Sequence, residues 1–540
     1  MGAASIPLIK AGAVSERYTQ RVFRRFREPI EPEGFTPDWD DQPSRHTFYE
    51  RAPLLPLPIP FETAHAPLGE SLRRLADANS GQTSAVTWEV LSTILGAYCV
   101  NARRTQLTWG DDSTARLAAS HAVWGRATAS GGGMYPAEAY LVMGGGTPVL
   151  PGIYHHDTAY HGLARLSVGD VTGHIHDAIN DERVRGANCY LIATARFWKS
   201  TFKYNNFAYH LVTQDMGALL GSWRILLSAA GVGSSTTLWF NEQQVDQILD
   251  LDTADESSFA VLSFRWPAAG APSRREAEAA ASRTILSRAV RARLTPWERS
   301  RSIRRFPEVE TVHAAALVGS APRPASPDPP RRLDNASPAS GLLMEADLRQ
   351  CFRERRSSFG LFTSSPPMER ELLETVLWAC AMAAQAPTDV MLSRTRLWVL
   401  ANAVAGLKSG VYRYEGSREQ LVRLQELDVG ALLQRLYALD NYNMTQVAAV
   451  LVISGFLDEA RETYGDRGYR MLNLEVGAVA QTAYLAAAAT GIGCGAVLGI
   501  DNVAVDELLG IASSGENSLL FVLLGHERPG AARVRHEVPC

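Results

Sequence analysis

Residues 472–493, LNLEVGAVAQTAYLAAAATGIG, form a long apolar stretch built mainly from small side chains. Its pieces VGAV at 476–479 and ATGIG at 489–493 resemble MGAL at 216–219 and AAGVG at 229–233, which lie 260 residues earlier. Each stretch predicts a helix that ends at a glycine, because glycine readily adopts the left-handed conformation that closes a helix. The recurrence indicates that one structural unit occurs twice.

Three further pairs of segments keep nearly the same spacing. They are Val245-Asp246 with Val505-Asp506, Ser258 before FAVLSF with Ser518 before LLFVLL, and GIYHHD at 152–157 with GVYRYE at 410–415. Four anchors within two residues of one period predict two copies of one domain. We place the copies at 65–270 and 345–540, after an N-terminal extension at 1–64 that carries no interpretable motif.

The segment between the copies, 271–344, has the composition of a linker. Ten arginines lie between 271 and 305, and six prolines lie between 321 and 340. The proline-rich part predicts an extended, solvated chain. The arginine run is typical of a solvated helix face, and it is also compatible with a patch that binds RNA or a leader peptide.

Composition excludes several classes of protein. The chain has 540 residues and a formal charge of −4, so no general electrostatic attraction to nucleic acid or to an acidic membrane is expected. The charge-free stretch 477–500 is long enough to span a bilayer, but it contains Gln481, and its relative at 217–240 carries Arg224. A buried helix that runs into a strand is the better interpretation of both stretches.

The cysteines are few and scattered, which predicts a reducing compartment and a cytoplasmic protein. No CxxC pair occurs, so neither a zinc ribbon nor a disulfide scaffold is expected. The six cysteines stand at 99, 189, 351, 380, 494 and 540.

The hydrophobic pattern predicts helices and strands in mixed order within each copy. Apolar residues recur at helical spacing in 88–100 and 372–384. Strands are expected at 138–143, 187–195, 395–402 and 448–455, with hairpin turns leading into IYHH and VYRY. Strands mixed with long helices imply an α+β fold built in layers.

The first candidate site is the run Arg355, Arg356, Ser357 and Ser358. Two adjacent guanidinium groups followed by hydroxyls suit a phosphate, whose oxygens accept paired hydrogen bonds from arginine. A solvated pair of surface arginines is the alternative interpretation of this motif alone.

The second candidate is the loop ASGGGMYP at 129–136, just before a strand. Its three glycines carry no Cβ, so a flat ring system can approach the backbone. An ordinary glycine-rich loop is the alternative.

The third candidate is the pair Lys203-Tyr204, which places an amine beside a phenol. A lysine that is desolvated in a pocket loses proton affinity and can act as a general base. A surface-reaching lysine and a half-buried tyrosine on an amphipathic segment are the alternative.

Taken together, these motifs resemble the nitroreductase family of flavin proteins. The second copy contributes RRSS, the small-residue helix and the final LLFVLLG strand, and the first copy contributes SGGGMYPAEAYLV, PGIYHH and Lys203-Tyr204. The first copy resembles more narrowly the SagB-type azoline dehydrogenases, which oxidise thiazoline and oxazoline rings in ribosomally made peptides. The resemblance implies a tandem duplicated nitroreductase-like fold that forms a pseudo-dimer within one chain, with a further homodimer left open.

The resemblance also implies FMN, bound in the interface between the two copies. Each copy has lost part of the motif set: the second reads AAQAPTDVML at 383–392 where the glycine loop is expected, and ARETYGDRGYR at 460–470 where Lys-Tyr is expected. The first copy reads LRRLADANSGQ at 72–82 and lacks hydroxyls after Arg74. The surviving halves add up to one complete site, so we predict one FMN, not two.

Carried over by the resemblance, each site residue has an expected role. Arg355, Arg356 and Ser357, with Arg528, are expected to hold the FMN phosphate. Ser130, Gly131 and Gly132 are expected to line the isoalloxazine ring, and the backbone at Val497, Leu498 and Gly499 is expected to approach N5. Lys203 and Tyr204 are expected to face the substrate, an azoline-containing precursor peptide delivered by cyclodehydratase partner proteins.

Two other functions are compatible with the sequence. One is an NAD(P)H-dependent nitro- or ene-reductase on the same scaffold, and the other is a flavin-free subunit that presents the peptide. A serine hydrolase is not supported, because no GxSxG motif occurs. No HExxH motif occurs either, and His155-His156 is interpreted as hairpin surface, so no metal site is predicted.

Overall fold

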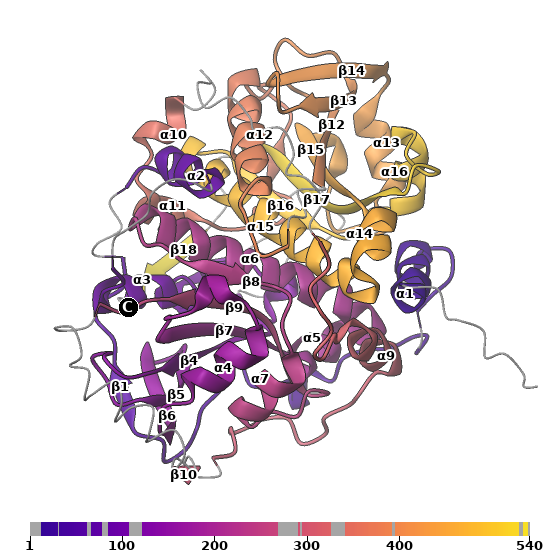
Figure 1. The fold of residues 1–540 in the computed structure, drawn as a ribbon. Helices are drawn as coiled ribbons and strands as arrows, with labels where there is room; N and C mark the ends of the chain where they lie inside the picture. Colours follow the sequence, from indigo (N-terminus) through magenta and orange to yellow (C-terminus); the bar gives the residue numbers. More distant parts are fainter. Residues whose placement is uncertain are drawn as a thin grey trace, which may run out of the picture.

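The computed structural model describes most of the chain. The described residues are 12–30, 32–61, 66–77, 85–106, 121–267, 290–291, 294–325, 341–390, 395–528 and 533–537. Two halves, each with its own antiparallel sheet, lie on either side of a central layer of long helices (Figure 1). The arrangement is the α+β fold that the sequence predicts.

The first half follows the N-terminal helix α1 (Ala13–Arg24) and the short strand β1 (Leu54–Pro56). Its helices are α2 (Leu68–Ala76), α3 (Trp88–Gly96), α4 (Thr172–Ile179), α5 (Phe197–Tyr204), α6 (Ala208–Ala229) and α7 (Glu242–Leu249). Its strands are β2 (Val100–Gln106), β3 (His121–Arg126), β4 (Ala137–Met143), β5 (Gly152–Asp157), β6 (Gly162–Val168), β7 (Cys189–Arg196), β8 (Ser235–Thr237) and β9 (Glu256–Phe264). The main sheet has the order β1-β6-β5-β4-β7-β9-β8.

The second half repeats this plan. Its helices are α10 (Gly341–Glu345), α11 (Leu348–Glu354), α12 (Arg370–Ala384), α13 (Val429–Leu436), α14 (Leu457–Tyr464), α15 (Asp466–Thr490) and α16 (Asn502–Leu509). Its strands are β11 (Phe362–Thr363), β12 (Thr395–Ala401), β13 (Gly410–Glu415), β14 (Gln420–Glu426), β15 (Ala449–Phe456), β16 (Gly493–Val497) and β17 (Glu516–Glu527). The strand order β14-β13-β12-β15-β17-β16 matches β6-β5-β4-β7-β9-β8.

Helices α6 and α15 cross at the centre of the molecule through two equivalent contacts. A Cβ on Gly217 would overlap the carbonyl of Leu474, and a Cβ on Gly477 would overlap the carbonyl of Gln214. The 260-residue repeat converts one contact into the other, because it relates Gly217 to Gly477 and Gln214 to Leu474. Such reciprocal contacts are typical of the interface of a symmetric dimer. Tyr209 and Tyr469, also 260 apart, stack with ring centroids 6.4 Å apart. The chain is therefore a pseudo-dimer within itself.

Equivalent buried carboxylates fix the start of the last strand in each half. Asp246 accepts a hydrogen bond of 2.8 Å from the N–H of Ser258, and Asp506 accepts one of 2.8 Å from the N–H of Ser518. Burial raises the pKa of each aspartate to about 6. The repeated VD and Ser-strand motifs of the sequence are thus one structural device used twice.

The central strands of each main sheet are buried on both faces, which explains their continuous apolar sequences. The inner faces pack on the central helices and form one hydrophobic core that runs through both halves. Helices α4 and α7 cover the outer face of the first sheet, and α13 and α16 cover that of the second. The described residues contain no helix long and apolar enough to cross a membrane.

The ends of the chain tie the halves together. Helix α1 packs against α15 and α16 of the second half, and the C-terminal strand β18 (Arg533–Glu537) pairs with β2 of the first (Figure 1). The predicted linker contains a helix, α9 (Pro307–Ala316), that buries one face and that the sequence analysis did not predict. Residues 268–289 and 326–340, which hold four of the ten arginines and four of the six prolines, lie outside the described residues.

Most predicted elements are found, with small differences at their ends. Residues 477–490 belong to α15, which ends at Gly491 in the left-handed conformation (φ 74°), and the chain then enters β16. The predicted helix at 88–100 is shorter, because α3 ends at Gly96 and a strand begins at Val100. The first small-residue helix ends at Ala229, and Gly231 takes the left-handed conformation two residues later.

Candidate functional site

A cavity of about 950 Å3 lies at the contact between the two halves. The first half supplies the glycine loop, the end of α5 and one side of α6. The second half supplies the chain after α11, one side of α15 and the end of β16. The volume is in the range of cavities that hold ligands the size of a nucleotide cofactor.

The glycine loop is held in shape by a buried aspartate of α6. Asp215 accepts hydrogen bonds from the Ser130 hydroxyl (2.6 Å) and from the Gly131 N–H (2.8 Å). Burial raises the pKa of Asp215 to about 7. Across the interface, the Ala129 N–H donates to the side chain of Gln481 on α15 (2.9 Å), so both halves position the loop.

Gly132 is a position where a side chain would be strained. Its backbone has φ 60°, in the left-handed region, and a Cβ there would overlap the Tyr204 hydroxyl and crowd the Lys203 amine. The loop and the Lys-Tyr pair therefore pack directly on each other. The sequence places them more than 70 residues apart.

Lys203 lies half-buried in the last turn of α5. Its Nζ is 5.2 Å from the ring centroid of Tyr204 and 5.8 Å from that of Trp39. No carboxylate of the described residues forms an ion pair with it, and burial lowers its pKa. Burial raises the pKa of Tyr204, so the phenol keeps its proton. The pair therefore presents to the cavity an amine with lowered proton affinity and a neutral hydroxyl.

The arginine end of the cavity is built from the chain after α11. Arg355 is buried, donates to the carbonyl of Arg126 (2.8 Å), and lies 5.4 Å from the ring centroid of Tyr484. Arg356 forms a two-pronged ion pair with Glu527, which the sequence did not predict. Two guanidinium groups against one carboxylate leave this end positively charged.

The hydroxyls of Ser357 and Ser358 form hydrogen bonds with α15 and β16 of the same half. Ser357 Oγ lies 3.0 Å from the Tyr484 hydroxyl, which also accepts the N–H of Ala496 (2.7 Å). Ser358 Oγ accepts the N–H of Cys494, and its own N–H donates to the Cys494 carbonyl. Ser358 is therefore a structural link to β16, and Ser357 remains at the cavity wall.

All but one of the predicted site residues line this single cavity. They are Ser130, Gly131, Gly132, Lys203, Tyr204, Arg355, Arg356, Ser357, Val497, Leu498 and Gly499. Arg528 does not line it: its backbone N–H and Nε donate to the carbonyls of Leu361 and Phe362. The prediction for Arg528 thus finds no direct support in the geometry.

The sequence interpretation missed two groups of lining residues. The N-terminal extension reaches the cavity through Arg25 and Phe26, and Arg25 donates to the carbonyl of Leu498. Tyr437 and Tyr442 stack face to face at 5.8 Å on the second half. Asp215 could have been predicted as a site residue, because it is an isolated acid in an apolar helix. No motif in the N-terminal extension indicates that Arg25 and Phe26 reach the cavity.

The prediction for His155 and His156 is wrong in one respect. Both imidazoles are buried, with exposed fractions of 1% and 0%, and neither lies on a hairpin surface. They point to the two faces of strand β5, because side chains alternate along a strand. His155 bonds to Glu138 at 3.0 Å, and Glu138 also pairs with Lys199.

Comparison with known proteins decides the family. The model of the nitroreductase family matches residues 82–264 and 352–526, one match for each half. The chain belongs to the nitroreductase family. A putative nitroreductase of Methanocaldococcus jannaschii is 30% identical over 178 residues, which covers 32% of this chain and 88% of that protein.

One solved structure of a putative nitroreductase has the whole duplicated architecture. It comes from Anabaena variabilis ATCC 29413, is 21% identical, and has a TM-score of 0.70. The match covers 96% of this chain and 100% of that chain. The tandem nitroreductase fold is therefore shared by another protein.

The counterpart of the cavity on the other side of the pseudo-dimer is filled. A space of only about 40 Å3 remains between α6, α15 and the chain after α12. Arg224 stands where the repeat places Tyr484 on the other side, and it donates to the carbonyl of Pro387. The counterpart of Lys203 is Thr463, whose hydroxyl donates to the Glu459 carbonyl.

Proposed function

We propose that this nitroreductase-family chain is an FMN-dependent azoline dehydrogenase. It oxidises thiazoline or oxazoline rings of a ribosomally made peptide to thiazoles or oxazoles. The observation that carries the proposal is the desolvated amine of Lys203, packed beside Tyr204 against Gly132 in the large cavity. A reaction that must remove a carbon-bound proton needs such a base.

The residues of the cavity fit FMN. Gly131 and Gly132 line the cavity and carry no Cβ, so a flat ring can approach the backbone of the loop. Arg355, Arg356 and Ser357 give the opposite wall a positive charge and a hydroxyl, which suit a phosphate. The counterpart of this cavity on the other side of the pseudo-dimer measures only about 40 Å3, which supports one FMN per chain.

Bound FMN supplies the acceptor for a hydride equivalent. In its deprotonated form, which burial favours by lowering the pKa, the Lys203 amine would take the ring Cα proton of the azoline. With FMN as the acceptor of the hydride equivalent, the ring would lose two hydrogens in all and become aromatic. Tyr204, which keeps its proton, donates a hydrogen bond that orients the substrate beside the amine. Phe26 and the Tyr437–Tyr442 pair supply apolar walls that exclude water and hold the ring.

The partners in this proposal are the azoline-containing precursor peptide and the cyclodehydratase that forms the azoline. The cavity is wide enough for a peptide ring beside a cofactor. Lining residues from three separate parts of the chain, including the N-terminal extension, give it walls that a small reductase substrate does not require.

The test uses the full-length protein, its bound flavin and an azoline-containing peptide. Azole formation is followed as a loss of about 2 Da per ring, the mass of two hydrogens. Lys203→Ala is expected to keep its flavin and to lose azole formation by at least about 100-fold, the usual contribution of a general base. Lys408→Ala removes a lysine on the far side of the second half and is expected to be unaffected.

The repeat offers a second matched control. Tyr204→Phe is expected to slow azole formation, whereas Tyr464→Phe, at the equivalent position of the second half, is expected to leave it unchanged. Normal turnover by Lys203→Ala contradicts the assigned base. The named relative is a putative nitroreductase, so rapid bleaching of the flavin by NAD(P)H with no reaction of the peptide would establish a reductase instead.

A further inference from the structure

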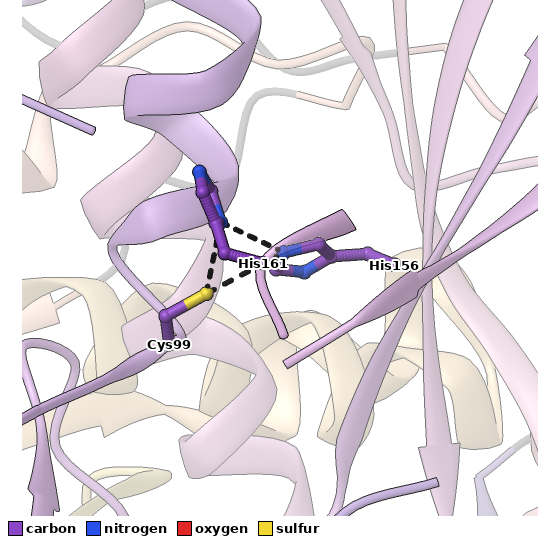
Figure 2. Close-up of side chains that lie close together, drawn as sticks. All are labelled: Cys99, His156 and His161. Carbon is purple, nitrogen blue, oxygen red and sulfur yellow. Dashed lines mark hydrogen bonds between the residues drawn. The ribbon is translucent and has the colours of Figure 1, made fainter. Parts of the chain in front are cut away.

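A second cluster of chemically capable side chains lies in the first half, away from the cavity. Cys99, His156 and His161 are buried, with exposed fractions of 1%, 0% and 7%. They come from three elements: the turn after α3, strand β5, and the turn between β5 and β6. Their polar atoms converge on one point (Figure 2).

The distances between the three atoms are those of a metal coordination sphere. Cys99 Sγ lies 3.5 Å from His156 Nε2 and 3.1 Å from His161 Nδ1, and the two nitrogens are 3.4 Å apart. A tetrahedral zinc ion with its usual bond lengths separates sulfur from nitrogen by about 3.5 Å and two nitrogens by about 3.3 Å. Only one of the three separations, that from Cys99 to His161, has to widen by a few tenths of an ångström.

A neighbouring hydroxyl fixes the orientation of one ring. Ser92 Oγ donates to the carbonyl of Pro58 and lies 2.7 Å from His161 Nε2. Because its own proton is used, the hydroxyl accepts the Nε2 proton, and Nδ1 keeps a lone pair that points at Cys99 and His156. Metal-binding histidines are typically held in this way by a hydrogen bond to the second nitrogen.

The surroundings keep both rings able to bind a metal. Burial lowers the pKa of His156 well below its ordinary value and that of His161 to about 4. Both imidazoles are therefore neutral at pH 7 and offer lone pairs. A thiolate with two imidazoles is a donor set that zinc prefers over calcium or magnesium.

We propose that Cys99, His156 and His161 bind one zinc ion. Binding replaces the thiol proton of Cys99, which is released to solvent, by a zinc–sulfur bond. Within the described residues no fourth His, Cys, Asp or Glu joins the cluster, so the protein supplies three ligands. The flavin chemistry proposed above does not use this site, because none of the three residues lines the large cavity.

The site has a structural role, because it joins the start of β2 to the β5–β6 hairpin. Cys99 follows Ala97, whose carbonyl accepts two hydrogen bonds from Thr128 at the base of the glycine loop. Zinc at Cys99 therefore stabilises the part of the first half that carries this loop. No sequence motif indicates the site, since the ligands are separated by 57 and 5 residues and match no zinc-binding pattern.

The test measures metal in the full-length protein. The protein is incubated with zinc and unbound metal is removed. Inductively coupled plasma mass spectrometry is then expected to find about one zinc per chain, as for a site with defined ligands. Cys99→Ala and His161→Ala are expected to lose the zinc. Cys189→Ala removes another buried thiol, one that contacts Met143 and lies on β7, and is expected to keep it.

Cobalt provides a readout that does not depend on the variants. Replacement of zinc by Co²⁺ in the wild-type protein is expected to give the visible bands of a tetrahedral cobalt–thiolate centre, at longer wavelengths than oxidised flavin absorbs. A natively folded wild-type protein that retains no zinc and gives no such bands overturns the proposal, and the cluster is then a hydrogen-bonded thiol–imidazole group. Stoichiometric copper in place of zinc also overturns it.

Discussion

The two halves of this protein share one backbone plan but differ in what they do with the space between them. On one side the glycine loop, the Lys-Tyr pair and the RRSS run surround about 950 Å3, and on the other about 40 Å3 remains. Three exchanges account for the difference: Arg224 for Tyr484, Thr463 for Lys203, and the chain at 385–389 for the glycine loop. The comparison teaches that a duplicated fold can keep its interface symmetric while only one of its two sites survives.

The symmetric part of the comparison is tested at the crossing of α6 and α15. Gly217→Ala and Gly477→Ala each place a Cβ against a backbone carbonyl of the opposite helix, so each is expected to lower the free energy of unfolding by about 3 kcal/mol. Urea denaturation measures both. Gly173→Ala, a helical glycine with open space around it, is the control and is expected to change stability by less than about 1 kcal/mol. Clearly unequal losses at Gly217 and Gly477 would break the symmetry.

The asymmetric part is tested by transferring one residue from the filled side. Tyr484→Arg puts a second buried cation beside Arg355 and fills the cavity as Arg224 fills its counterpart. We expect flavin affinity to fall by at least about 100-fold, equivalent to about 2.7 kcal/mol. Flavin content is read from the absorbance of the purified protein.

The control for this exchange is Tyr484→Phe. It removes only the hydroxyl that meets Ser357 and Ala496, and it is expected to retain flavin. Flavin that binds Tyr484→Arg as tightly as wild type would show that the cofactor lies elsewhere.

Gly132 sharpens the comparison at the loop that only the first half has kept. Gly132→Ala brings a Cβ onto the Tyr204 hydroxyl, and we expect flavin affinity to fall by about 10-fold, or 1.4 kcal/mol. Gly133→Ala carries a similar backbone strain (φ 68°) but meets open space, so it isolates the steric effect. Equal effects at the two positions would mean that backbone strain alone matters.

Asp215 gives the smallest expected effect, seen as a pH dependence of stability. Its pKa rises from 3.8 to about 7 on burial, so between these values the unfolded chain ionises while the folded chain stays neutral. The free energy of unfolding therefore falls as pH rises from about 4 to about 7, and the loss due to Asp215 is complete above about pH 7. Asp215→Asn removes this pH dependence. The difference in free energy of unfolding, variant minus wild type, is therefore expected to rise by at least about 1 kcal/mol from pH 5 to pH 8.

The measurement is denaturant unfolding of the flavin-free proteins at the two pH values. Asp246 and Asp506, which also have a raised pKa, titrate in both proteins and cancel in the difference. A difference that does not vary with pH would contradict a buried, neutral Asp215.

The duplication, the main helices and strands, and the unequal survival of motifs in the two halves could all be predicted from the amino-acid sequence. These features depend on local patterns: apolar spacing along α12 and β15, the glycine end of α15, and repeated segments such as those before β9 and β17. Local patterns persist in the fold because each helix or strand satisfies its own backbone hydrogen bonds and buries its own apolar face.

The contacts between side chains that are distant in the sequence became visible only in the folded protein. The packing of Gly132 on Tyr204, the pairing of Arg356 with Glu527, the entry of Arg25 into the cavity and the convergence of Cys99 with His156 and His161 join residues from separate elements. No local pattern encodes these contacts, because they depend on how α6 and α15 cross and on where the chain ends return. The sequence predicted one complete site from two incomplete halves, and the fold supplied the geometry that brings those halves together.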